Sequence, residues 1–165
     1  MIPLSALSNV NLQPGELYLA ADPAILETIL GSCVAATFWS KRLHAGALCH
    51  GVLPRCPDKV PLGFTPHDGH RYVDFSIRYL LAQFEGLGAR RQELEIKLFG
   101  GADVLPVYGN GNPTVGALNC AAALEVLQEE GLTALARDLR GANGRRIHFH
   151  TGTGEVLVHR LMRSM

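Results

Sequence analysis

A cysteine and a histidine that could do covalent chemistry together occur in two neighbouring apolar stretches of this chain. Cys33 follows Gly31-Ser32 and precedes the apolar run 34–39, and His50 ends the apolar run that begins at Ala45. An imidazole that takes the proton of a thiol converts the cysteine into a nucleophile able to attack a carbonyl carbon. The sequence therefore predicts a thiol–imidazole site, provided that the fold brings the two side chains together.

The two apolar stretches have the pattern of a β-hairpin with the basic tip Ser40–His44. With the hairpin centred between Lys41 and Arg42, Cys33 lies directly opposite His50. Directly opposed residues on antiparallel strands point to one face with Cβ atoms about 4.5–5.5 Å apart. This register predicts a contact between the thiol and the imidazole.

Cys33 also has an ordinary structural explanation, because a lone cysteine in an apolar strand is more often inert core. Three features favour chemistry. Gly31 and Ser32 allow a sharp turn whose backbone N–H groups could support an oxyanion. Cys33 faces His50 in the hairpin register, and an unpaired imidazole in an apolar strand would be costly.

The other cysteines and histidines have weaker claims. Cys49 adjoins His50 and so points to the opposite face of the strand, which predicts a core position, and neither Cys56 nor Cys120 has a base beside it in the sequence. His67 and His70 could ligate a metal, but a solvated surface is the more common explanation. The same holds for three histidines on the terminal strands, His148, His150 and His159.

Gly100-Gly101 follows a predicted strand, but the spacing of a nucleotide-binding glycine motif is absent. The pair therefore predicts close backbone packing near an active site rather than a phosphate cradle.

The elements that must position these residues alternate between strands and two helices. Val73, Ile77, Leu80, Leu81 and Phe84 form an amphipathic helical stripe. We expect strands at 16–20, 94–99, 146–151 and 155–161, and in the hairpin stretches 31–39 and 45–54. Helices are expected from about 70 to 86 and 115 to 130, and loops at 55–69 and 106–113, while residues 24–30 and 132–139 fit either helix or strand. The second helix should bury Leu118, Ala121 or Ala122, Leu124 and Leu127. This order predicts an α+β fold of the α/β sandwich type, with mostly antiparallel or mixed β-sheets and helices packed outside.

Bulk properties exclude several classes of function. The 165 residues predict one domain, 1–165, whose first 15 residues form a loose N-terminal arm. Fifteen basic and fifteen acidic residues give no net charge, which argues against a nucleic-acid partner. No apolar run is long enough to insert in a membrane, and the N-terminus lacks the features of a signal peptide, which predicts a cytoplasmic protein. The four cysteines have neither disulfide nor zinc spacing.

Taken together, these residues resemble the chemoreceptor glutamine deamidase family, CheD. The matching pieces cover about residues 10 to 161 and are Thr28-Ile29-Leu30-Gly31-Ser32-Cys33-Val34-Ala35, Gly46-Ala47-Leu48-Cys49-His50-Gly51-Val52-Leu53-Pro54, Tyr72-Val73-Asp74, Lys97-Leu98-Phe99-Gly100-Gly101-Ala102, Val115-Gly116-Ala117-Leu118-Asn119 and Thr151-Gly152-Thr153-Gly154-Glu155-Val156. The family often has Arg where this chain has Leu118, and Gly-Gly where it has Gly141-Ala142, which puts partner contacts in question more than the thiol chemistry.

The resemblance implies a hydrolase, a protein-glutamine glutaminase, that converts receptor glutamines to glutamates with release of ammonia. It implies Cys33 as nucleophile, His50 as base and Thr28 as the third polar residue, with backbone support at Gly31 and Ser32, no metal or organic cofactor, and a fold similar to deamidating toxins. The implied partners are chemoreceptor helices and a CheC-type phosphatase.

Two other functions stay open at this point. The protein could act chiefly as a binding module that regulates the CheC-type phosphatase of the response regulator, or as a redox or structural thiol protein.

Overall fold

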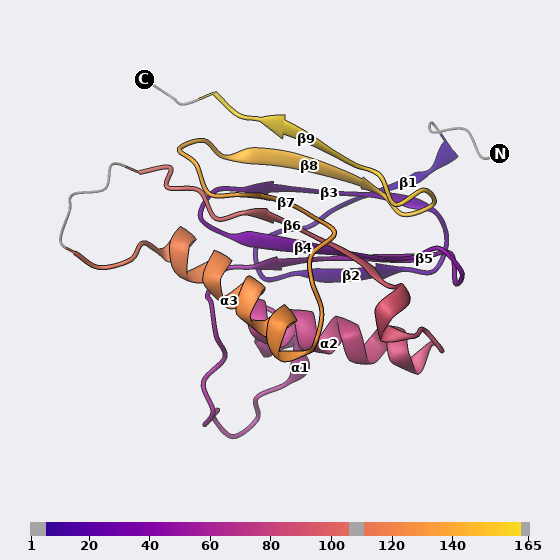
Figure 1. Cartoon of the computed structure of the whole chain (residues 1–165), viewed down its shortest axis with the longest axis horizontal. Coiled ribbons are helices and arrows are strands. Elements are labelled where there is room, and N and C mark those ends of the chain that lie inside the picture. The colour runs from indigo at the N-terminus through magenta and orange to yellow at the C-terminus, as the bar shows by residue number, and fades with distance from the viewer. Residues whose placement is uncertain (1–5, 106–110, 163–165) are drawn as a thin grey trace.

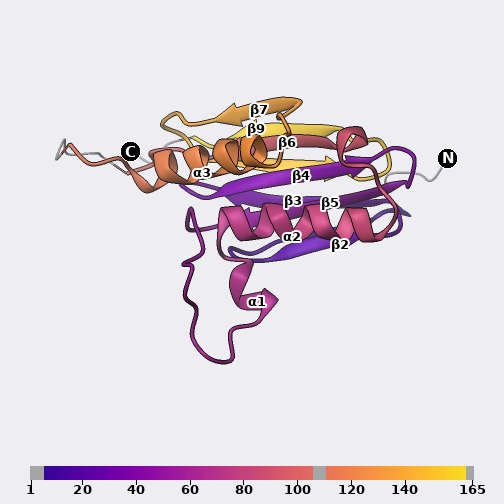
Figure 2. The same cartoon turned by 60° about the horizontal axis from the view of Figure 1, so that its bottom comes forward.

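Two β-sheets and a layer of helices make up the computed structural model, which describes residues 6–105 and 111–162 (Figure 1). The first sheet has the strand order β1-β3-β8-β9 and the second β2-β5-β4-β6-β7. The sheets lie face to face, and α2 and α3 cover the free face of the second sheet (Figures 1 and 2). The predicted α+β class, with mixed sheets and helices outside, is confirmed.

In the first sheet, β3 (Ala24–Leu30) pairs parallel with β1 (Ser8–Asn11) and antiparallel with β8 (Arg145–His150), and β9 (Val156–Arg160) forms the edge. The segment that fitted either helix or strand is thus a strand, and its burial alternates along its length. The expectation of a loose N-terminal arm is wrong for the four residues of β1, which form a strand. This segment is polar and has no apolar alternation of its own, and it is ordered by its pairing with β3. Residues 1–5 of that arm lie outside the described residues.

The second sheet contains β2 (Leu17–Ala20), β5 (Ala45–Gly51), β4 (Val34–Ser40), β6 (Glu95–Gly100) and β7 (Ala136–Leu139). All its neighbours are antiparallel except β6 and β7, which are parallel. The second ambiguous segment, 132–139, therefore also contains a strand.

The hairpin of β4 and β5 is present, but its predicted register is wrong by two residues. Ala35, not Cys33, pairs with His50, and Ser40 pairs with Ala45. The physical reason is the turn: Ser40 continues the strand and its Oγ accepts a hydrogen bond from the Leu43 N–H (3.2 Å), so the turn is centred one residue further along. Cys33 itself precedes β4.

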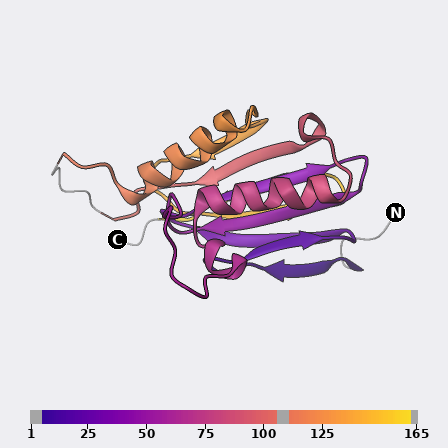
Figure 3. The same cartoon turned by 90° about the horizontal axis from the view of Figure 1, so that it is seen from below.

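The helices are α1 (Pro66–Gly69), α2 (Val73–Gly86) and α3 (Val115–Glu129), with a 3₁₀ turn, η2, at Arg91–Glu93. Helices α2 and α3 lie across the second sheet when the molecule is seen from below (Figure 3). The expected stripe of α2 is buried, whereas α1 lies at the end of the segment expected to be a loop.

The buried face of α3 is in part the expected one, since Ala122 and Leu127 are buried, but it differs at the start of the helix. Leu118 is 43% exposed, and the helix instead buries small and polar residues near its start, including Gly116, Asn119 and Cys120. The expectation was wrong for Leu118 because it followed the large apolar residues, while close approach of α3 to the backbone after β6 requires small ones.

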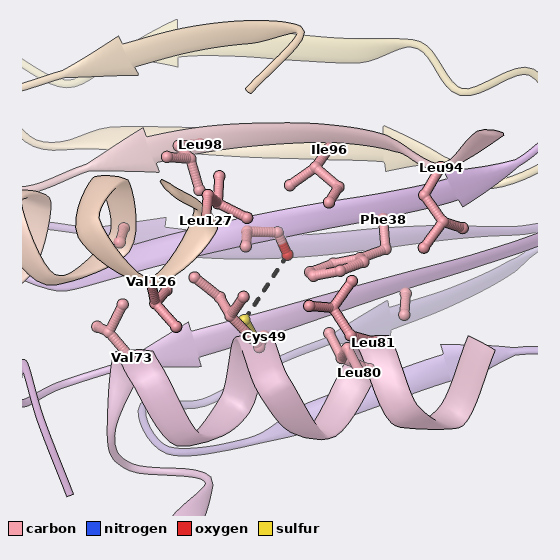
Figure 4. Packing of buried hydrophobic residues seen from close by; sticks show 14 of the residues in the cluster. Phe38, Cys49, Val73, Leu80, Leu81, Leu94, Ile96, Leu98, Val126 and Leu127 are labelled. Atoms are coloured by element: carbon pink, nitrogen blue, oxygen red, sulfur yellow. Dashed lines mark hydrogen bonds between the residues drawn. The ribbon is translucent and has the colours of Figure 1, made fainter. Parts of the chain in front are cut away.

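Two hydrophobic cores hold the layers together. Between the sheets, Leu26, Leu48 and Phe149 are fully buried. Between the second sheet and the helices, Phe38 stacks on Phe84 with ring centroids 5.9 Å apart, inside the cluster drawn in Figure 4. Full burial of each such side chain stabilises the fold by roughly 1.5–3 kcal/mol.

Within the described ranges, none of the helices combines the length and the apolar character that a membrane crossing would need.

Candidate active site between the two sheets

His50 lies near the end of β5, and its side chain is directed between the two sheets. Residues alternate faces along a strand, so His50 shares the face of Leu48, which belongs to the core between the sheets. Across the interface, β3 supplies Thr28, and both side chains are only 1% exposed. Thr28 Oγ1 is 2.6 Å from His50 Nδ1. The site is therefore assembled from two different sheets.

The hydrogen bonds of Thr28 fix the tautomer of His50. Thr28 Oγ1 donates its one hydrogen to the backbone carbonyl of Leu12, at 2.8 Å. The hydroxyl can then only accept from the imidazole, so the proton of a neutral His50 sits on Nδ1. This leaves the lone pair on Nε2, which is the nitrogen that can act as a base.

Nε2 of His50 is buried and has no hydrogen-bond partner in the described part of the chain. Burial lowers the pKa of His50 to about 4, and the negative charge of Glu16 opposes that shift. At neutral pH the imidazole is therefore uncharged, with one unpartnered basic nitrogen inside the protein.

Cys33 lies in the short connection between β3 and β4, is partly buried, and packs against the core between the sheets. Because Ala35 pairs with His50, Cys33 is not opposite His50 and lies one residue before β4 begins. The structure thus places Thr28, Cys33 and His50 around one interface, by a different register than predicted.

The thiol is uncharged at rest. Burial raises the pKa of Cys33, and its own backbone N–H, which donates to the sulfur, offsets part of that shift. The raised pKa of Cys33 and the lowered pKa of His50 both favour a neutral pair over a thiolate–imidazolium pair. Proton transfer then has to accompany attack by the sulfur.

Three successive backbone carbonyls hold the connection that carries Cys33. The carbonyl of Gly31 accepts from the N–H of Ala102 (2.9 Å), and that of Cys33 accepts from the N–H of Gly101 (2.8 Å). The carbonyl of Ser32 accepts from the side-chain amide of Asn119 (2.9 Å).

The backbone at Gly100 lies so close to Cys33 that only glycine fits at this position. Its φ is +106°, and a Cβ at this position would lie 2.2 Å from the Cys33 carbonyl oxygen. The predicted close backbone packing of Gly100-Gly101 is confirmed, and it lies against the connection that carries Cys33. Sequence reasoning did not assign a role to Asn119 or to the carbonyl of Leu12, because neither contact has a local signature in the sequence.

The remaining cysteines lie elsewhere. Cys49 points into the core on the helix side, where its sulfur approaches the Ala36 carbonyl at 3.8 Å (Figure 4). Its core position is as predicted, and burial raises its pKa to about 12. Cys120 is buried against the carbonyl of Gly100 at 3.8 Å. These thiols are structural.

The histidines outside the site do not form a metal centre. His67 lies on α1 and His70 just after it, with ring centroids 6.1 Å apart, and His148 pairs with Glu27 at 2.8 Å. Across residues 6–105 and 111–162, no three histidine, cysteine or acidic residues come together in a group that could hold a metal ion.

A groove of about 600 Å³ opens beside the Cys33 connection. Gly31 forms part of its wall, together with the exposed apolar side chains Ile29, Val104 and Leu105. The groove places an apolar surface of the molecule two residues from the thiol.

Comparisons with known proteins place the chain in a family. Residues 60–160 match the family model described as CheD chemotactic sensory transduction. A "Probable chemoreceptor glutamine deamidase CheD 2" of Geobacter sulfurreducens is 40% identical over 96% of this chain and 93% of its own length. Proteins called "Probable chemoreceptor glutamine deamidase CheD" are 38% identical in Maridesulfovibrio salexigens, over 98% of this chain and 96% of their own, and 41% identical in Rhodospirillum rubrum, over 89% and 79%. We conclude that the chain belongs to the CheD family.

Proposed function

We propose that this protein is a protein-glutamine deamidase that converts glutamine side chains of chemoreceptors to glutamate, with Cys33 as nucleophile and His50 as general base. The observation that carries the proposal is the Leu12–Thr28–His50 chain of hydrogen bonds, which leaves Nε2 of a neutral imidazole free. The relatives named as chemoreceptor glutamine deamidases supply the substrate class.

In the proposed reaction, Nε2 of His50 takes the proton of Cys33 while the sulfur attacks the carboxamide carbon of a glutamine. The C–N bond breaks, and His50 returns its proton to the departing nitrogen, which leaves as ammonia. Water, deprotonated by the same imidazole, then attacks the thioester, restores the thiol and leaves a glutamate. Thr28 holds His50 in the tautomer and orientation that these transfers require.

Backbone N–H groups around Cys33 are the proposed support for the oxyanion. The carbonyls of Gly31, Ser32 and Cys33 are held on the side of β6 and α3, which fixes the orientation of the peptide groups of this turn. In other enzymes one well-placed donor of this kind contributes roughly 3–4 kcal/mol to the transition state.

The groove beside Gly31 supports a helical protein as substrate. Its apolar wall could receive the apolar face of a receptor helix, and a glutamine on that helix would then approach Cys33. The proposed place of action is the cytoplasm, on the cytoplasmic helices of the receptors.

The test is incubation of a receptor cytoplasmic fragment with the protein, followed by peptide mass spectrometry. Each deamidation replaces NH₂ by OH and raises the peptide mass by about 1 Da. The proposal requires this change at defined glutamines, and a receptor fragment of unchanged mass under turnover conditions would contradict it.

Docking to a CheC-type phosphatase is the second candidate function. The exposed apolar side chains around the groove favour it, because such patches commonly mark protein partners. A Cys33→Ala protein that still stimulates the phosphatase would show that docking does not depend on the thiol.

A further inference from the structure

Asn119 joins the two segments that carry the proposed catalytic pair. It lies on the buried face of α3 and is 0% exposed. Its side-chain Nδ2 donates to the carbonyl of Ser32 at 2.9 Å and to the carbonyl of Val52 at 3.0 Å. Ser32 directly precedes Cys33, and Val52 lies two residues after His50.

The orientation of the Asn119 amide follows from its partners. Both neighbours are carbonyl oxygens, which can only accept, so the NH₂ group must face them. Both hydrogens of this group are then used, one for each segment. A single planar group therefore sets how the residue before Cys33 and the end of β5 lie relative to each other.

The support behind Asn119 is rigid. A Cβ on Gly116, one turn earlier on α3, would lie 2.6 Å from the Gly101 carbonyl oxygen. Cys120 follows directly and lies against the carbonyl of Gly100. Because α3 packs backbone to backbone at this point, Asn119 has little freedom to move away from its two partners.

Only one side of the Asn119 amide has partners among the described residues. Oδ1 of Asn119 is buried and has no hydrogen-bond partner among the described residues. An apolar residue of the same size would remove the donor to the carbonyls of both Ser32 and Val52. The arrangement is suited to holding two backbone segments at one separation.

We propose that Asn119 is a positioning residue of the site: it holds the Cys33 connection and the end of the His50 strand in the register that lets the imidazole act on the thiol. The proposal rests on the proposed function of Cys33 and His50. Asn119 is buried and acts through the backbone, so its loss should lower kcat of deamidation and leave KM unchanged.

The experiment measures the thiol directly and needs no receptor. The rate at which iodoacetamide alkylates Cys33 is measured at a series of pH values between 6 and 9. Peptide mapping identifies the alkylated residue, so that reaction at the other three cysteines is not counted. The proteins compared are the unsubstituted chain, Asn119→Leu, Asn119→Gln and His50→Ala. Val126→Ala is the control, because Val126 is fully buried on the same helix but belongs to the core on the helix side.

We expect Asn119→Leu to alkylate about tenfold more slowly near pH 7, with the pH profile of His50→Ala, because a small misplacement of reacting groups has effects of this size. Asn119→Gln keeps the amide on a longer side chain, so its alkylation rate should lie between those of the unsubstituted chain and Asn119→Leu. Val126→Ala should unfold at a lower temperature with an unchanged profile.

A folded Asn119→Leu protein with the alkylation profile of the unsubstituted chain would overturn the proposal. So would equal slowing by Val126→Ala, since the effect would then report stability alone. If alkylation of Cys33 depends on His50 and Asn119 as expected but no receptor glutamine is deamidated, the proposed substrate is wrong and the role of Asn119 is supported.

Discussion

Thr28 of one sheet and His50 of the other share a hydrogen bond of 2.6 Å across the interface between the sheets. The relationship makes the proposed base dependent on how the two sheets pack, because neither sheet alone fixes both side chains. The packing of Leu26, Leu48 and Phe149 around this interface therefore also sets the geometry of the site.

Replacing Thr28 by Val keeps the shape of the side chain but removes the acceptor for the Nδ1–H of His50. A buried donor left unpaired destabilises the fold by about 1–3 kcal/mol, and the imidazole loses its fixed tautomer. We expect kcat for receptor deamidation to fall by about 10- to 100-fold. The matched variant Thr28→Ser keeps the hydroxyl and should retain most of the activity, and a Thr28→Val enzyme with unchanged kcat would show that the hydroxyl does not position the base.

Burial of His50 predicts a specific loss of stability in acid. Its pKa is about 4 in the folded protein against 6.5 for a free imidazole, so between these values the unfolded chain binds a proton that the folded chain does not. The free energy of unfolding is therefore highest above pH 6.5 and falls as the pH drops toward 4, by roughly 3 kcal/mol from this group.

Urea unfolding at a series of pH values measures this slope. His50→Gln should have a shallower decline than the unsubstituted protein in the same window. Parallel curves for the two proteins would mean that His50 does not resist protonation in the folded state.

The same pKa predicts how activity depends on pH. A base with a pKa of about 4 is already unprotonated at pH 6, so its availability does not change between pH 6 and pH 7. A base with the ordinary pKa of 6.5 would become about threefold more available over that interval. Initial rates of deamidation at saturating receptor fragment, measured at both pH values, separate these two cases.

Gly100→Ala tests the support of the Cys33 connection. The added Cβ would lie 2.2 Å from the Cys33 carbonyl oxygen at a φ of +106°, so the backbone must shift. We expect a loss of more than about 2 kcal/mol in the free energy of unfolding and slower alkylation of Cys33.

Gly86→Ala is the matched control, since a Cβ there meets no heavy atom within 4 Å and α2 tolerates alanine well. Equal stability of Gly100→Ala and Gly86→Ala would contradict the close approach seen at Gly100.

The sequence predicted those parts of the fold that have a local pattern. The apolar stripe of α2, the alternation of β6 and the terminal hairpin were correct. Strand β1 had no such pattern, because its order comes from pairing with β3.

The members of the proposed site follow from the sequence, but its geometry does not. Cys33 and His50 were identified from residue type and spacing, but their register depends on where the turn after Ser40 is centred, which the sequence did not determine. No role could be assigned to Asn119 from the sequence, because its two partners lie 87 and 67 residues away in the chain.

The most direct test of the central claim compares the unsubstituted protein with Cys33→Ser on one receptor fragment, with deamidation followed at each glutamine by mass spectrometry. Serine keeps the size of the side chain but is a far weaker nucleophile than a thiol with the same neutral base. We predict glutamine-to-glutamate conversion by the unsubstituted protein and none above background by Cys33→Ser, with both proteins equally folded. Conversion by Cys33→Ser at the rate of the unsubstituted protein would contradict the assignment of Cys33 as the nucleophile.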